Sequence, residues 1–111
     1  MHTVISKDGT KIAYKINGNG PVVILVDGAF CSKDFGPTPK LVPVLANNFT
    51  VISYDRRARG DSSDTQPYSV QREIEDIEAL INIGRGTAYL YGVSSGAVLC
   101  IEAVASGLPV K

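Results

Sequence analysis

A serine between two glycines, Gly92-Val93-Ser94-Ser95-Gly96, is the stretch whose spacing points most directly to chemistry. An apolar run precedes it and apolar residues at helical spacing follow it, which predicts a strand, a sharp turn and a helix. Gly92 and Gly96 would let strand and helix approach closely around a strained turn. We expect Ser94 to be an exposed nucleophile, with the Ser95 amide at a helix N-terminus that attracts negative charge. An ordinary turn between a strand and a helix is the alternative interpretation.

A second short motif, Asp27-Gly28-Ala29, follows a continuous apolar run at residues 22–26. A β-branched run without alternation predicts a strand covered on both faces, as in a parallel sheet. Open α/β sheets bind ligands beyond the carboxyl ends of their strands, which is where this motif would lie. A glycine at that place lets main-chain amides turn toward a ligand. A plain turn at the end of a strand explains the same residues equally well.

Strands and helices alternate along most of the chain. Residues 3–6 and 11–16 predict an antiparallel hairpin with one solvated face, because Asp8-Gly9 is a turn-forming pair between them. Residues 49–53 predict another buried strand. The alternation after Pro21 predicts an α/β fold with one doubly wound sheet in a single domain.

Two further helices are expected before the serine motif. A short amphipathic helix is predicted from Lys40 to Ala46, although it contains a proline. Ser69 is a suitable N-cap for a longer helix through Ile83, and Gly84 is well placed to end it. In that longer helix the predicted buried face is Val70, Ile74, Ile77 and Ile81, and the predicted solvated residues are Arg72, Glu73, Asp76 and Glu78.

Both signs of charge are concentrated in the loop at residues 54–64. A charged loop at the ends of strands could form the wall of a site. Pairs of arginine and aspartate more often fix the conformation of a loop, and we favour that interpretation here.

Composition argues against several classes of partner. Lys and Arg number 11, as do Asp and Glu, so the formal net charge is zero and neither nucleic acid nor an anionic membrane is an expected partner. No apolar run is long enough to span a membrane, and no secretory signal is visible, which predicts a cytoplasmic protein. Cys31 and Cys100 form neither a C-x-x-C pair nor part of a histidine cluster, so we expect free thiols and no metal.

Taken in this order, the motifs resemble the amino-terminal half of the catalytic domain of the α/β-hydrolase family, over essentially all 111 residues. The resemblance implies that Ser94 is the nucleophile, that the substrate is a small ester or related acyl compound, and that no cofactor is needed. It also implies an oxyanion hole made by the backbone amides of Ser95 and Ala29. The supporting glycines of these motifs are Gly28, Gly92 and Gly96.

Two positions depart from the family pattern. Family members usually carry His-Gly where this chain has Asp27-Gly28. A carboxylate near a developing oxyanion would oppose it unless an arginine such as Arg56 or Arg57 were paired with that carboxylate. In the charged loop, Ala58 stands where the family has a glycine.

The triad that would activate Ser94 is incomplete in this sequence. His2 is the only histidine and starts the first predicted strand, whereas the acid and the histidine of this family follow the serine. Both would lie beyond Lys111, so residues 1–111 are expected to be a partial domain that is inactive alone or needs a complementing chain. The strand predicted at residues 87–91 would then present a hydrophobic edge to a second copy or to that chain.

Three functional interpretations remain open at this point. The first is a serine hydrolase completed by further sequence. The second is a non-catalytic interaction or regulatory half-domain, or a truncated gene product, in which Ser94 is a relic. The third is a nucleotide-binding α/β domain, which is disfavoured because Gly18-Asn19-Gly20 and Gly84-Arg85-Gly86 lack the G-x-G-x-x-G spacing and no P-loop lysine is present.

Overall fold

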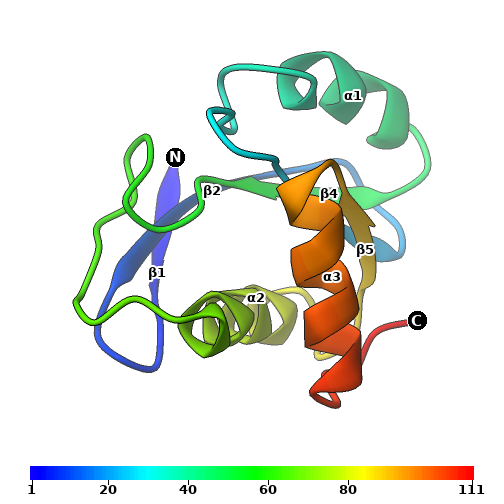
Figure 1. Ribbon diagram of the computed structural model, residues 1–111. Coiled ribbons are helices and arrows are strands. Elements are labelled where there is room, and N and C mark those ends of the chain that lie inside the picture. Colours follow the sequence, from blue (N-terminus) through cyan, green and yellow to red (C-terminus); the bar gives the residue numbers. More distant parts are fainter.

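Five strands form one mixed sheet, in the order β1-β2-β4-β3-β5, in the computed structural model, which describes residues 1–111 (Figure 1). β2 pairs antiparallel with β1 and β4, and β3 pairs parallel with β4 and β5. The predicted α/β class, with a hairpin leading into a parallel sheet, is confirmed. The strands are β1 (His2–Ile5), β2 (Lys11–Asn17), β3 (Val22–Val26), β4 (Thr50–Tyr54) and β5 (Tyr89–Gly92).

Three helices cover the two faces of the sheet: α1 (Thr38–Leu45) lies on one face, and α2 (Val70–Ile83) and α3 (Ser95–Ala105) lie on the other (Figure 1). Side chains of β3 alternate between these layers, as the period of a strand requires. Val23 and Leu25 pack toward α1, while Ile24 belongs to the larger core under α2 and α3. The buried helix residues of that larger core are Ile74, Ile77, Leu80, Ile81, Leu99 and Ala103.

The hairpin departs from the expected solvated face. Gly9 makes the turn with a φ of 90°, which an L side chain rarely adopts. On β2, however, three consecutive residues, Ile12, Ala13 and Tyr14, are buried. The loop after β4 lies along the main chain of β2, where the Ala13 N–H donates to the Ser62 hydroxyl at 2.9 Å.

Helix α1 begins two residues earlier than expected. Thr38 and Pro39 occupy its first turn, where a proline loses nothing because the first N–H groups have no partner within a helix. The predicted limits at Lys40 and Ala46 are therefore wrong at the N-terminal end, and Ala46 is the C-cap residue.

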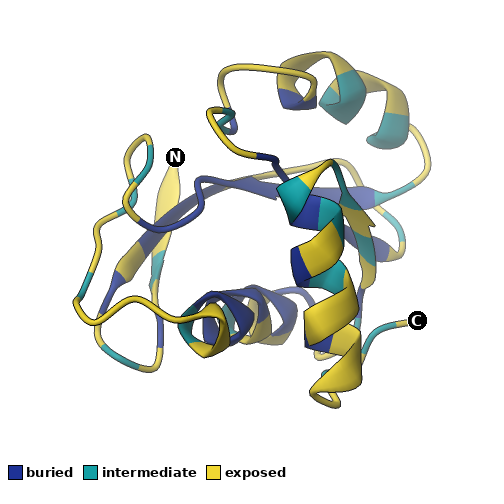
Figure 2. Ribbon diagram, in the orientation of Figure 1, coloured by how far each residue is buried: buried dark blue, intermediate teal, exposed yellow.

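The limits of α2 are those expected, but its charged face is not. Ser69 caps the helix by accepting a hydrogen bond from the Arg72 N–H, and Gly84 ends it. Glu73 and Asp76, expected in solvent, are only 3% and 1% exposed, whereas Val70 is 46% exposed (Figure 2). The burial of two carboxylates is possible because arginines from the loop after β4 reach them, which helical periodicity alone does not reveal.

β5 lies at one edge of the sheet. Ala88, immediately before β5, forms an isolated parallel bridge with Val110. This bridge is the only strand-like pairing on the outer side of β5. Tyr89 and Tyr91 on β5 are each more than two-fifths exposed. No helix of this fold combines the length and apolarity needed to cross a membrane.

Candidate active site

Ser94 lies at the turn between β5 and α3, and α3 begins at the next residue. Its φ of 55° and ψ of −120° lie in a region that residues with a Cβ rarely adopt, and the residue is exposed. Such a backbone conformation costs about 1–3 kcal/mol and persists only where the surrounding structure imposes it. The strained turn predicted for the serine motif is thus present in the fold.

The two glycines of the motif lie where the backbones touch. A Cβ on Gly92 would be 2.6 Å from the Ala97 Cα, and a Cβ on Gly96 would be 2.6 Å from the Asp27 main-chain oxygen. Real Cβ atoms do not make contacts this short. Gly92 therefore lets β5 meet the first turn of α3, and Gly96 lets α3 sit against the end of β3.

The Asp27-Gly28-Ala29 segment lies beside Ser94, because β3 and β5 are neighbouring parallel strands with Val26 opposite Gly92. A Cβ added to Gly28 would be 3.2 Å from the Ser94 Cβ. The exposed Ala29 follows immediately. The fold thus brings together the two motifs that are 65 residues apart in the sequence.

The amides of Ala29 and Ser95 are both free. Neither N–H donates to a main-chain acceptor or to a side chain of the protein. The next amides of the turn are engaged, since the Gly96 N–H donates to the Val93 oxygen at 2.8 Å and the Ala97 N–H to the Ser94 oxygen at 3.0 Å. The N-terminus of α3 also carries the positive end of the helix dipole, which favours an anion. Two main-chain donors without a partner therefore lie in the segments that meet at Ser94, one in the serine turn itself and one in the residue after Gly28.

Asp27 is 2% exposed and lies at the end of β3 without an ion-pair partner. Its Oδ1 accepts a hydrogen bond from the Thr38 hydroxyl at 2.6 Å, and its Oδ2 is buried with no partner. Burial raises the pKa of this carboxyl, although the Thr38 hydrogen bond acts in the opposite direction. The uncharged form is therefore favoured more than in an ordinary aspartate.

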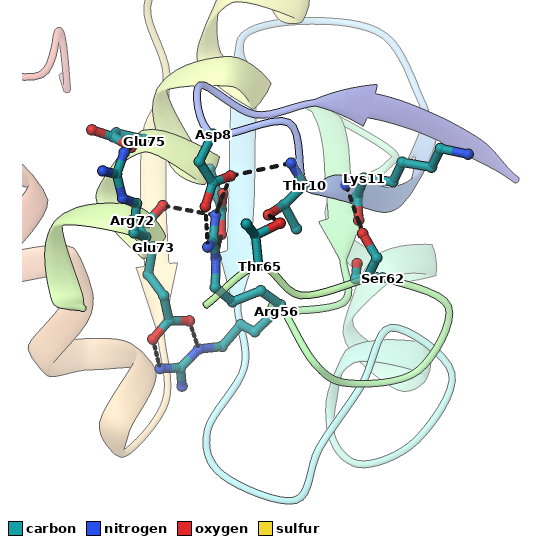
Figure 3. Close-up of polar contacts among 12 residues, drawn as sticks. Asp8, Thr10, Lys11, Arg56, Ser62, Thr65, Arg72, Glu73 and Glu75 are labelled. Carbon is teal, nitrogen blue, oxygen red and sulfur yellow. Dashed lines mark hydrogen bonds and ion pairs between the residues drawn. The ribbon is translucent and has the colours of Figure 1, made fainter. Parts of the chain in front are cut away.

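The arginine considered as a partner for that carboxylate binds elsewhere. The Arg56 Nε and Nη2 atoms donate to the two carboxylate oxygens of Glu73 at 2.7 and 2.8 Å (Figure 3). Its Nη1 atom donates to the main-chain oxygen of Asp27 at 3.0 Å and to the Ser95 hydroxyl at 2.9 Å. Arg56 thus contacts the candidate site at the main-chain oxygen of Asp27 and at the hydroxyl of Ser95. The sequence did not indicate this role.

Arg57 and Asp55 of the loop after β4 form structural ion pairs, the role favoured from the sequence. Arg57 pairs with Asp76 of α2 at 2.7 Å and with Asp8 of the hairpin turn at 2.8 Å. Asp55, which is fully buried, accepts from the Lys33 ammonium group at 2.8 Å. These pairs join the hairpin, the loop and α2. They give the buried carboxylates of Asp55 and Asp76 a cation each.

His2 lies far from Ser94 in the sheet order. It belongs to β1 at one edge, whereas Ser94 follows β5 at the opposite edge. Its ring packs against Tyr14, with centroids 5.4 Å apart. His2, the only histidine among residues 1–111, is therefore not placed to act on Ser94.

Comparison with known proteins identifies similar chains. An α/β hydrolase from Sphaerobacter thermophilus is 54% identical, with a TM-score of 0.93 over 98% of this chain and 42% of that protein. An esterase from Exiguobacterium antarcticum, at 22% identity and a TM-score of 0.86 over 97% of this chain and 41% of the esterase, shows likeness of fold alone. The uncharacterized hydrolase YraK of Bacillus subtilis is 34% identical over 98 residues, which are 85% of this chain and 35% of YraK. No protein-family model matches. The chain spans well under half the length of each of these proteins.

Proposed function

We propose that this chain, which belongs to the α/β-hydrolase fold family and has the fold of its amino-terminal part, carries the nucleophile and oxyanion hole of a serine hydrolase. The substrate class would be a small ester or related acyl compound. The observation that carries the proposal is Ser94 itself, which is held in a strained, exposed turn with the unpaired Ser95 amide next to it and the Gly28-Ala29 segment against it.

In the proposed reaction, the Ser94 hydroxyl oxygen attacks the acyl carbonyl carbon. The carbonyl oxygen gains negative charge as the tetrahedral intermediate forms, and the Ala29 and Ser95 N–H groups donate to it. Loss of one such donor typically costs about 3 kcal/mol of barrier. Both donors are main-chain groups, so the side chain at position 27 does not supply either of them.

A serine hydroxyl also needs a base to take its proton and an acid to orient that base. We propose that both come from polypeptide outside residues 1–111. The curated and solved relatives are more than twice as long as the segment matched here, which leaves room for these groups. We propose accordingly that residues 1–111 form only part of the catalytic domain.

The free edge of β5 is the proposed place for that further polypeptide. Tyr89 and Tyr91 are partly exposed there, and apolar hollows lie on both sides of the strand. One hollow of about 620 Å³ includes Leu45 and Phe49, and the other of about 370 Å³ includes Ile101 and Val104. An edge of this kind pairs readily with another strand, from a continuation of the fold, a complementing chain or a second copy.

A serine-directed fluorophosphonate probe tests the proposal, applied to residues 1–111 together with the further polypeptide that supplies the base and the acid. Mass spectrometry of the labelled protein should locate the adduct on Ser94, and Ser94→Ala should abolish labelling. Ser106→Ala is the matched control, because Ser106 lies at the other end of α3 and its hydroxyl only donates to the Ala103 oxygen. Equal labelling of the wild type and Ser94→Ala would contradict the proposal. A folded wild type that takes up no probe would favour a non-catalytic half-domain.

A further inference from the structure

Arg56 contacts both segments that supply the proposed oxyanion donors. One of its nitrogen atoms, Nη1, donates to the Asp27 main-chain oxygen and to the Ser95 hydroxyl. The Asp27 oxygen belongs to the peptide unit immediately before the one that carries the Ala29 N–H. The Ser95 hydroxyl belongs to the residue that carries the second donor. A single atom thus bridges the end of β3 and the start of α3.

The guanidinium group of Arg56 is itself held rigidly. Its side chain is 6% exposed, and its other two nitrogens form a bidentate pair with Glu73, which fixes the plane of the group (Figure 3). Glu73 also accepts from the Tyr68 hydroxyl at 2.5 Å. Helix α2 therefore anchors the bridge, and this anchor explains why a carboxylate of α2 is buried.

We propose that Arg56 is a positioning residue that sets the spacing between the Ala29 and Ser95 amides. The inference rests on the function proposed above. Donors of an oxyanion hole act on charge that develops in the transition state, and they need accurate geometry to do so. Loss of the bridge is therefore expected to slow the reaction of Ser94 without weakening the initial binding of a probe or substrate.

Arg57 provides a matched control. It is the next residue, it is also buried, at 3% exposure against 6% for Arg56, and its guanidinium group likewise pairs with carboxylates, those of Asp8 and Asp76. It contacts neither Asp27 nor Ser95. Its replacement should lower stability as much as replacement of Arg56 but should leave the two amides in place.

The kinetic test uses the protein completed by the polypeptide that supplies the base and the acid. It measures phosphonylation of Ser94 by a fluorophosphonate as a function of probe concentration, at a temperature where circular dichroism shows every variant folded. Arg56→Met should lower the maximal rate at least about tenfold with an unchanged half-saturating concentration, since a misplaced group can cost ~100-fold. Arg57→Met should stay within about threefold of the wild type. Arg56→Lys should recover part of the rate, because the lysine ammonium group can donate hydrogen bonds but lacks the planar, bidentate geometry of a guanidinium group. Equal rates for Arg56→Met and Arg57→Met would overturn the proposal.

Ser95→Ala provides the same test without an unpaired buried charge, in case Arg56→Met does not fold. It removes one end of the bridge and should also lower the maximal rate, and an unchanged rate would overturn the proposal. A readout that needs no activity is the Ala29 amide resonance in ¹H–¹⁵N spectra. It should move in Arg56→Met or Ser95→Ala and stay in place in Arg57→Met. If Ser94→Ala labels like the wild type, the proposed function fails, whereas an unmoved Ala29 resonance overturns the positioning role by itself.

Discussion

The backbone of Gly28 lies against the side chain of Ser94, so that a Cβ on Gly28 would be only 3.2 Å from the Ser94 Cβ and 3.0 Å from the Val93 oxygen. This contact joins the end of β3 to the serine turn. It accounts for glycine at position 28 through space alone, since its φ is not in the left-handed region. Ala29, the next residue along the chain, is exposed, as Ser94 is.

Gly28→Ala is expected to displace Ser94 by a few tenths of an ångström. The rate of fluorophosphonate labelling should fall about tenfold, because reacting groups tolerate little misplacement. Gly86→Ala is the control, since Gly86 has a φ of 80° and open space around it, so its replacement costs stability far from Ser94. Labelling that is slowed equally by both substitutions would show that the Gly28 contact has no special effect.

Asp27→Asn tests the buried carboxyl at the end of β3. Burial raises the pKa of Asp27 in the folded state, so its contribution to stability is complete below the unfolded pKa of about 3.9 and is lost as the pH rises through the folded value. The asparagine variant does not titrate. The free energy of unfolding of the variant minus that of the wild type, measured by urea denaturation, should therefore be larger at pH 7 than at pH 3.5. Replacement by asparagine thus helps stability more, or harms it less, at pH 7. A difference that is the same at both pH values would contradict the raised pKa.

Ala58→Gly should stabilise the protein. Ala58 has a φ of 67°, a left-handed conformation in which its Cβ costs about 1–2 kcal/mol, partly offset by the greater freedom of glycine in the unfolded chain. We expect a gain of about 1 kcal/mol in urea unfolding. Ala46→Gly is the control, because Ala46 has a right-handed φ of −65° and glycine should destabilise there. A loss of stability in both variants would show that the turn at Ala58 is not strained.

Cys100 should react slowly with alkylating reagents at neutral pH. Burial in α3 raises the pKa of its thiol to about 11, and the thiolate is the reactive form. Its modification by iodoacetamide, followed by peptide mass spectrometry in a Cys31→Ser background, should accelerate about tenfold per pH unit between pH 8 and pH 10. A rate that levels off below pH 9 would show that the thiol is not shielded in this way.

Local patterns in the sequence predicted the elements that position the site. Val22–Val26 is a continuous apolar strand because both of its faces are covered by helices. The cap at Ser69 and the stop at Gly84 are short-range features, so the limits of α2 could be predicted. That the two glycine motifs share one site was implied by the family resemblance, and the contact between Gly28 and Ser94 brings the two segments together.

The charged interior was not predictable in the same way. Periodicity placed Glu73 and Asp76 in solvent, because it assigns each residue by its own polarity and cannot detect a partner 17 or 19 residues earlier in the chain. The bridge made by Arg56 depends on three segments that meet only in the fold. A loop rich in both charges, followed by an acidic helix, was the available signal, and it suggested pairing without saying which groups would pair.

A crystal structure of the protein after reaction with a small alkyl fluorophosphonate tests the central proposal most directly. The phosphonyl group mimics the tetrahedral intermediate of acyl transfer. It should be bonded to the Ser94 Oγ, with one phosphonyl oxygen within hydrogen-bond distance, about 2.7–3.1 Å, of both the Ala29 and Ser95 amide nitrogens. An adduct on another residue, or a phosphonyl oxygen that contacts neither amide, would contradict it.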